Sequence, residues 1–276
     1  MQIALIKNKI IPIEKLEPVY FDHGLFFGDG VYEVIRSYNG RIFALDEHLQ
    51  RFSQSLDAIE ITGVDIAWIR SNVLKAFDAA DISDAKIYFH ITRGSGPRNH
   101  VCDTLKPNFY LTITELEDDT EIKAKGIAVS TFPDWRWKRC DIKSLNLLPN
   151  VLARQDASKK GCDEAIFVNE VGHITEGASS AFFAILGQTL KTSPLTANIL
   201  PSITRQFVIE AGKNINLEIV EKSLTPDDVC SSDELFIAVT TKDIIPVVKF
   251  DEKVIASGKP GKFTKLLTDE FQKFTR

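Results

Sequence analysis

Residues 139–148 read Arg-Cys-Asp-Ile-Lys-Ser-Leu-Asn-Leu-Leu and place one lysine, Lys143, in a mostly apolar setting. A carboxylate follows at Glu176, in the run His-Ile-Thr-Glu-Gly-Ala-Ser-Ser of residues 173–180. A desolvated lysine loses its proton more readily than a solvated one, and the neutral amine is a nucleophile toward aldehydes. The stretch therefore indicates either a reactive amine or, as for most lysines, a solvated surface group.

A lysine followed by a carboxylate is also what a pyridoxal 5'-phosphate (PLP) site requires. Such a site needs a lysine that forms a Schiff base with the aldehyde and a carboxylate that keeps the ring nitrogen protonated. It also needs an anion hole for the phosphate and a group that grips the substrate. Lys143 and Glu176 are candidates for the first two parts. Taken alone, Glu176 is better explained as a turn carboxylate before Gly177.

The run Leu-Pro-Ser-Ile-Thr-Arg at residues 200–205 predicts the start of a helix. The first amides of a helix are unpaired and lie at its positive end, so those of Ile203 and Thr204 could bind a phosphate. Thr240, at the end of a predicted strand, and Arg51, on a predicted helix, could add a hydroxyl and a charge. Each signal is weak alone, because a Ser-Ile-Thr sequence is more often only a helix cap.

The loop of residues 93–100, Arg-Gly-Ser-Gly-Pro-Arg-Asn-His, is rich in glycine but lacks the Gly-Lys-Ser/Thr ending of a P-loop. Arg98 and His100 are two residues apart, so on an extended loop they could point the same way. Together they could bind a carboxylate through charge-assisted hydrogen bonds. The alternative is an ordinary solvated loop.

Other kinds of catalytic site find little support. His23 and His48 are isolated, so no metal site is expected. The four cysteines have no CxxC spacing, which disfavours both a disulfide framework and a zinc site. Ser144 and Ser179 lack an obvious histidine partner, so a serine hydrolase is not expected.

The composition excludes several further classes. The formal net charge of −5 and the pI of about 5.6 argue against nucleic acid as a partner, although a local cationic pocket could still bind small anions. No apolar run reaches the ~18 residues that span a bilayer. The first residues lack the pattern of a signal peptide, so we expect no membrane partner and a cytoplasmic location.

The periodicity predicts two α/β-type domains: a small N-terminal domain of residues 1–118, a linker at 119–124 and a larger C-terminal domain of residues 125–276. Asn39-Gly40 between two β-rich runs predicts a type I′ hairpin. Strands are predicted at residues 3–6, 10–13, 31–38, 41–43, 86–92, 109–114, 126–132, 165–169, 181–186, 235–240 and 245–250. Helices are predicted at residues 45–59, 68–77, 150–160, 202–212 and 260–274, with a further helix start at Thr225.

Five motifs together resemble the fold-type IV PLP enzymes, the class IV aminotransferases, and most of all the D-amino acid aminotransferases. The resemblance runs over nearly the whole chain. It is carried by residues 27–34 (Phe-Gly-Asp-Gly-Val-Tyr-Glu-Val), 92–94 (Thr-Arg-Gly), 139–148, 175–177 (Thr-Glu-Gly) and 203–205 (Ile-Thr-Arg). The resemblance implies an α/β (α+β) two-domain fold of fold type IV, with PLP as cofactor.

The resemblance also implies a role for each residue of the cofactor site. Lys143 forms the Schiff base and later carries the proton between the substrate Cα and the cofactor C4′. Glu176 pairs with the ring nitrogen, and Leu200 packs on the ring face. The phosphate is held by Arg51, by the amides of Ile203 and Thr204, and by Thr240. Arg136 lies near the ring hydroxyl, with Glu164 as its partner.

The substrate grip points to the subfamily. The D-amino acid aminotransferases hold the substrate carboxylate with a tyrosine and an Arg-x-His pair from the neighbouring subunit, and this chain has Tyr32, Arg98 and His100 in the matching places. The resemblance therefore implies a homodimer with its active site at the subunit interface. The implied activity moves an amino group between D-amino acids, such as D-alanine and D-glutamate, and 2-oxo acids, such as pyruvate and 2-oxoglutarate.

Three alternatives stay open. Aminodeoxychorismate lyase, which forms 4-aminobenzoate and pyruvate, shares Lys143 and Glu176 but does not need the trio at the substrate grip. A branched-chain L-amino acid aminotransferase is disfavoured by the same trio, and a PLP-binding protein without turnover is the third. Ala181 and Val239 depart from the family pattern, which usually has an asparagine and a serine there; the expected consequences are altered fine positioning and weaker cofactor retention.

Overall fold

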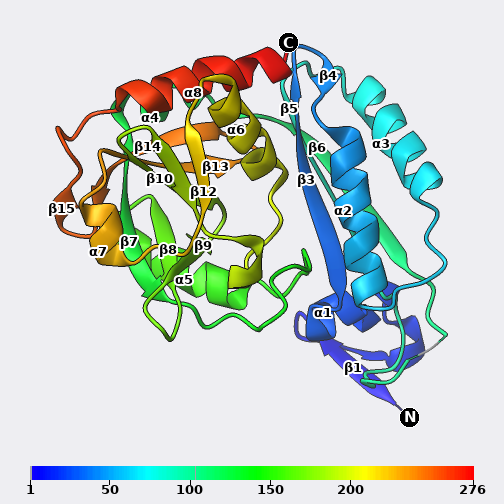
Figure 1. Cartoon of the computed structure of the whole chain (residues 1–276). Helices are drawn as coiled ribbons and strands as arrows, with labels where there is room; N and C mark the ends of the chain where they lie inside the picture. The colour runs from blue at the N-terminus through cyan, green and yellow to red at the C-terminus, as the bar shows by residue number, and fades with distance from the viewer. Residues whose placement is uncertain (1, 103) are drawn as a thin grey trace.

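The computed structural model describes residues 2–102 and 104–276. Figure 1 shows two bodies side by side, the N-terminal half in blue and cyan and the C-terminal half in green to red. A short hairpin comes first, β1 (Ile3–Ile6) and β2 (Lys9–Pro12), at the lower end of the N-terminal half. Lys7 and Asn8 both have positive φ there, as a two-residue type I′ turn requires.

The N-terminal half is built on an antiparallel sheet of order β4-β3-β5-β6. Its strands are β3 (Gly30–Tyr38), β4 (Arg41–Ile42), β5 (Ala85–Thr92) and β6 (Asn108–Glu115). The predicted Asn39-Gly40 turn is confirmed, since both residues have positive φ. Helices α2 (Leu45–Ala58) and α3 (Ile66–Ala80) cover one face and bury Phe52, Phe89 and other apolar side chains.

Alternation along β3 decides what each face of this sheet offers. Val31, Glu33 and Ile35 are fully buried, on the side of the helices. Tyr32 and Arg36 therefore belong to the opposite face, because successive side chains of a strand point to opposite sides. One strand thus supplies both the core of the N-terminal half and residues that face the C-terminal half.

The C-terminal half holds a sheet of order β12-β11-β10-β13-β14-β7-β8-β9, with β15 paired to β14. Its strands are β7 (Ile127–Pro133), β8 (Glu164–Val168), β9 (Ile174–Gly177), β10 (Ala181–Leu186), β11 (Thr189–Thr192), β12 (Glu218–Glu221), β13 (Glu234–Val239), β14 (Asp243–Phe250) and β15 (Lys253–Val254). Its helices are α5 (Leu148–Lys159), α6 (Ile203–Asn214), α7 (Pro226–Cys230) and α8 (Lys262–Phe274).

The sheet is mixed: β14, β7 and β8 run parallel, whereas β13 and β10 are antiparallel to their neighbours. Helices α6 and α8 pack on one side around Phe183, Phe236 and Leu267. The two halves touch where Phe43 meets Phe207, with ring centroids 4.7 Å apart. No strand pairing in the described ranges joins β3–β6 to the large sheet.

Several short elements were not expected. The prediction lacked α1 (His23–Phe27), β9, β11, β12, β15 and α4 (Thr120–Lys125), which occupies most of the predicted linker. The division into domains at residues 119–124 remains our proposal. Within the described ranges, no helix has the length and apolar character needed to cross a membrane.

Candidate active site

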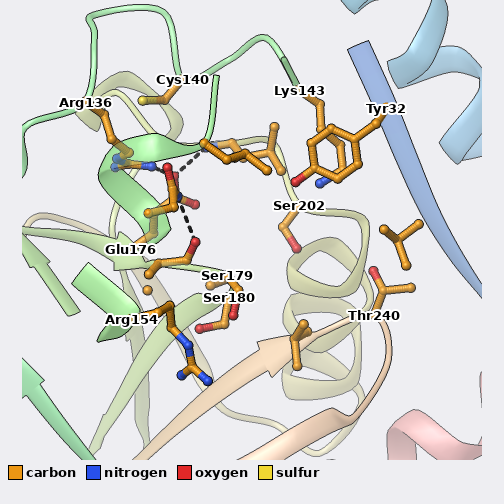
Figure 2. A pocket seen from close by; sticks show the side chains of 18 of the residues that line it. Tyr32, Arg136, Cys140, Lys143, Arg154, Glu176, Ser179, Ser180, Ser202 and Thr240 are labelled. Carbon is orange, nitrogen blue, oxygen red and sulfur yellow. Dashed lines mark hydrogen bonds and ion pairs between the residues drawn. The ribbon is translucent and has the colours of Figure 1, made fainter. Parts of the chain in front are cut away.

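A cavity of about 680 Å³ opens where the two halves meet. Figure 2 shows Lys143 and Tyr32 on one side of it, with Arg136 and Glu176 on the other. Seven of the predicted residues line this cavity together: Tyr32, Arg51, Arg136, Lys143, Glu176, Leu200 and Thr240. The fold therefore gathers, from both halves, most of the residues that the motifs indicated.

Lys143 lies on the loop between β7 and α5, and this loop is bonded to the N-terminal half. The Tyr32 amide donates to the Lys143 carbonyl at 3.0 Å, and the Lys143 amide donates to Ser55 Oγ at 3.2 Å. The Lys143 Nζ lies 4.2 Å from the centroid of the Tyr32 ring. No carboxylate in the described ranges pairs with this amine, which is partly rather than fully buried. An unpaired amine therefore faces the cavity.

The glycine-rich motif before Tyr32 explains why the Lys143 loop can lie so close. Gly28 ends α1 with φ +67°, and a Cβ there would lie 2.4 Å from Asn146 Oδ1. Only glycine meets both conditions without strain. Arg93 holds the segment that contains Gly28 with two hydrogen bonds to the Asp29 carboxylate, of 2.6 and 3.1 Å. These motifs thus support the site from outside the cavity.

Glu176 is a buried carboxylate whose two oxygens have different surroundings. Oε1 accepts hydrogen bonds from Arg136 and from the Leu200 amide, the latter at 3.1 Å. Oε2 has no hydrogen-bond partner among the described residues. Burial raises the pKa of Glu176, and Arg136 opposes that rise. The free oxygen is suited to accept a hydrogen bond from a cationic ligand group.

Arg136 is held in place by a second carboxylate. Its Nε and Nη2 donate to the two oxygens of Asp134 at 2.8 Å each, and its Cζ lies 4.4 Å from the centroid of the Phe167 ring.

The position of Asp134 corrects one expectation, since Glu164 is not the partner of Arg136. Glu164 pairs with Arg154 at 3.2 Å and accepts hydrogen bonds from Ser179 and Ser180. Glu164 lies on β8, whereas Asp134 directly follows β7 and reaches Arg136 by a two-residue turn.

The start of α6 forms an anion cradle. Ser202 caps the helix by accepting from the Arg205 amide at 3.1 Å. The amides of Ile203 and Thr204 have no hydrogen-bond acceptor among the described residues. Thr240 Oγ1 lies 3.4 Å from Thr204 Oγ1, which brings the turn after β13 beside the helix start. A tetrahedral anion suits such a group of unpaired donors at a helix N-terminus.

Arg51 adds a fixed cation to the cradle. It donates to the Pro201 carbonyl at 3.0 Å and makes two hydrogen bonds to Glu33, at 2.8 and 2.7 Å. His48 bonds the same carboxylate at 2.8 Å. Burial would raise the pKa of Glu33, but Arg51 and His48 lower it to about 2. Glu33 is therefore ionised and fully buried, and it holds the guanidinium against Pro201, just before the start of α6.

Ile203 and Thr204, at the start of α6, are not among the residues that line the cavity, although Ser202 before them is. Arg98 and His100 do not line it either. Both are exposed, and both contact Phe27 at distances of 5.1 and 5.0 Å from its ring centroid. Neither lines the cavity that holds Tyr32. The expected carboxylate grip is therefore incomplete within one chain.

The match to a family model decides the identity, since the model of amino-transferase class IV covers residues 30–250. The chain belongs to the class IV aminotransferases. The D-alanine aminotransferase of Bacillus licheniformis is 39% identical over 249 residues, 88% of this chain and 87% of the relative. That of Staphylococcus haemolyticus is 34% identical over 274 residues, 98% and 97% of the two chains. The predicted family is thereby confirmed.

Solved structures of class IV aminotransferases and related proteins share the fold. The branched-chain amino acid aminotransferase of Escherichia coli superposes with a TM-score of 0.87 at 23% identity, covering 96% of this chain and 92% of that one. A putative 4-amino-4-deoxychorismate lyase of Legionella pneumophila gives 0.84 at 20% identity, covering 98% of both. Such identities establish the fold alone, and the predicted fold class is confirmed.

Sequence reasoning missed several residues of this class IV aminotransferase that line the cavity. Ser180, Arg154 and Ser202 do so, and only Ser202 had a local signal, as a helix cap. Ala181 and Val239, the two departures, also line the cavity at the start of β10 and the end of β13. Cys140 lines it as well, and burial raises the pKa of its thiol to about 11, so it stays protonated at neutral pH.

Proposed function

We propose that this class IV aminotransferase uses PLP to exchange the amino group between D-amino acids and 2-oxo acids, with D-alanine and 2-oxoglutarate as a substrate pair. The observation that carries the proposal is the arrangement around one cavity of an unpaired amine, a buried carboxylate with one free oxygen, and an anion cradle. The two D-alanine aminotransferases that match nearly the whole chain support the D-amino acid assignment.

The residues present fit PLP. An aldehyde, a pyridinium nitrogen and a phosphate each have a suitable partner: Lys143, Glu176 and the start of α6. When bound, PLP supplies an electron sink that acidifies the substrate Cα–H. Arg51, Thr240 and the amides of Ile203 and Thr204 would hold the phosphate. Leu200 would pack on the ring, and Arg136 would lie beside Glu176 at its edge.

Lys143 has two tasks in this proposal. Its Nζ would bind the cofactor covalently at rest, and after the substrate amine takes its place it would remove the proton from the substrate Cα and deliver it to the cofactor C4′. The face of Tyr32 lies 4.2 Å from that nitrogen, so it restricts where the released amine can move. Glu176 would accept a hydrogen bond from the protonated ring nitrogen, and Arg136 and Leu200 would keep it oriented.

The substrate carboxylate requires a grip that one chain does not complete. We assign it to Tyr32 together with Arg98 and His100 of a second copy, because the last two lie outside the cavity of their own chain. A cation and an imidazole on a neighbouring subunit would bind a carboxylate by charge-assisted hydrogen bonds. A homodimer is therefore part of the proposal.

A panel of D- and L-amino acids with 2-oxoglutarate tests the assignment. We expect D-alanine to change the absorbance band of the bound cofactor and to yield pyruvate and D-glutamate, and L-alanine to do neither. A response to the L-enantiomer alone would contradict the D assignment. A band that no amine changes would instead indicate a PLP carrier, and formation of 4-aminobenzoate from aminodeoxychorismate would indicate the lyase.

A further inference from the structure

The turn between β13 and β14 brings Thr240 and Thr241 to the cavity. Val239 and Asp243 form the last pair of the ladder, and the Lys242 amide donates to the Val239 carbonyl at 3.1 Å. This is a three-residue hairpin loop, in which a residue in the left-handed region usually closes the turn. Here the left-handed residue is Asp243, the first residue after the loop, with φ +58°, although glycine would adopt the conformation more easily.

The carboxylate of Asp243 is held by donors from two distant segments. The Nη1 of Arg36 donates to it at 3.2 Å, and the hydroxyl of Tyr38, also on β3, donates a second hydrogen bond. Lys123 Nζ donates from α4 at 3.1 Å. Asp243 is 7% exposed, so water has little access to these bonds. A strained residue is thus stabilised by contacts outside its own hairpin.

Arg36 grips the main chain of the turn as well. The Nη1 of Arg36 also donates to the Thr241 carbonyl at 3.0 Å. Asp119 completes the cluster through Lys123, at 3.0 Å, and Arg36, at 3.8 Å. Two cations and two carboxylates balance, so the cluster carries no net charge. The N-terminal sheet therefore holds both a side chain and a carbonyl of the turn that carries Thr240.

We propose that Arg36 and Asp243 are positioning residues for the anion cradle. By holding the turn, they keep the Thr240 hydroxyl beside the start of α6, where it lies 3.4 Å from Thr204 Oγ1. Their contribution is to slow the loss of a phosphate-bearing cofactor. This inference rests on the proposed function, because that function supplies the phosphate.

A simpler role would be general stabilisation of the contact between the two halves. The two roles differ in their dependence on the ligand's phosphate. Positioning of the cradle affects binding of PLP but not of pyridoxal, which has the same ring and aldehyde without the phosphate. General stabilisation affects both ligands alike, together with the melting temperature.

The test compares Asp243→Asn with Asp251→Asn in the full-length apoprotein. Asp251 is a matched control, since it also has positive φ, follows β14, and accepts a hydrogen bond from the Thr131 amide at 2.7 Å. PLP and pyridoxal affinities are measured by quenching of tryptophan fluorescence, beside the melting temperature. We expect Asp243→Asn to weaken PLP binding about tenfold and to leave pyridoxal binding unchanged. Asp251→Asn should change neither affinity.

Two further variants separate the ion pair from the backbone. Asp243→Gly relieves the left-handed conformation but removes the carboxylate, so it should lose PLP affinity as the asparagine variant does. Arg36→Gln should have the same selective effect, and it serves if the Asp243 variants do not fold. The double variant Arg36→Gln/Asp243→Asn should lose less than the sum of the two single changes.

The outcomes that overturn the inference are distinct from those that overturn the function. Equal losses for PLP and pyridoxal, or wild-type PLP affinity in both Asp243→Asn and Arg36→Gln, would remove the positioning role while transamination by the wild type stands. If Asp243→Gly kept wild-type PLP affinity while Asp243→Asn lost it, the conformation of the turn alone would explain the effect. That result would contradict a role for the ion pair between Arg36 and Asp243. A wild type that binds no PLP would refute the proposed function itself.

Discussion

The Nζ of Lys143 lies against the face of Tyr32, 4.2 Å from the ring centroid, although the two residues come from different halves of the chain. A backbone hydrogen bond of 3.0 Å between the same two residues keeps this arrangement in register. A protonated amine is attracted to an aromatic face, and the neutral amine remains free to react. The site therefore depends on the junction of the two halves.

Lys143 should be the residue that binds the cofactor. Borohydride reduction of the PLP-loaded protein, followed by peptide mass mapping, should place the adduct on the peptide that contains Lys143. Lys143→Ala should lose the adduct, and transamination should fall by roughly several orders of magnitude, because a covalent catalyst and a base are removed together. Lys86→Ala is the control, since Lys86 also lines the cavity. An adduct on Lys86 in the wild type would disprove the assignment.

Glu176→Gln should keep the adduct but lose catalysis. The amide cannot hold a proton on the ring nitrogen as a carboxylate does, so the Cα–H becomes a weaker acid. We expect turnover to fall by about a hundredfold or more, with the mass-mapped adduct still on Lys143. Glu164→Gln is a control of the same type on a neighbouring strand. Equal turnover in the wild type and in Glu176→Gln would exclude the assigned role.

Arg98→Ala should chiefly raise KM for D-alanine. The lost charge-assisted contact contributes about 2–3 kcal/mol to substrate binding. Arg70→Ala, on the exposed side of α3, should leave KM unchanged.

Mixing Arg98→Ala with Lys143→Ala chains tests whether Arg98 acts across a dimer. A heterodimer would then have one intact site of its two, so equal refolded mixtures should recover about a quarter of the wild-type rate at D-alanine concentrations well below KM. Absence of any recovery would place Arg98 in its own chain's site or outside the site.

Glu33 should make the folded state less stable at acid pH. Its pKa is about 2 in the folded chain against 4.5 as the ordinary value. The folded state therefore binds this proton less readily, and the stabilisation, about 3 kcal/mol, is present above pH 4.5 and is lost as the pH falls toward 2. Burial lowers the pKa of His48 as well. This histidine therefore also makes the folded state less stable as the pH falls, but over a range of higher pH.

Chemical denaturation of the wild type and Glu33→Gln at several pH values measures this effect. The glutamine variant should be less stable at neutral pH, because Arg51 is left buried without its partner. Its stability should change less than that of the wild type between pH 4.5 and 2. Parallel pH profiles for the two proteins would show that Glu33 is not the group responsible.

Local chemistry made many elements predictable from the sequence. Asn39-Gly40 adopts the positive φ values of the expected turn, and Thr225 forms a capping box with Asp228. The apolar spacing of residues 45–59 predicted α2 within one residue of its observed end. Each of these depends on neighbours within a few positions of the chain, so the sequence contains the necessary information.

Other features depended on contacts that sequence spacing does not reveal. All four residues of β9 are buried, so the strand lacks the alternation of apolar and polar residues that indicates a strand in a sequence. The sequence therefore favoured a turn at Glu176. Arg136 meets Glu176 across 40 positions, and the expected partner Glu164 lies with Arg154 instead. Which carboxylate meets which guanidinium is set by strand order and register.

The sequence by itself determined the chemistry of this protein: a lysine, a carboxylate and a helix start in motifs specific enough to indicate PLP, and the turns and amphipathic helices around them. Only the tertiary structure decided how these parts cooperate. It set Lys143 against Tyr32, left one oxygen of Glu176 free, and placed Arg36 on the turn that carries Thr240. The physical reason is range, since propensities act between neighbours whereas burial and ion pairing act between segments that folding brings together.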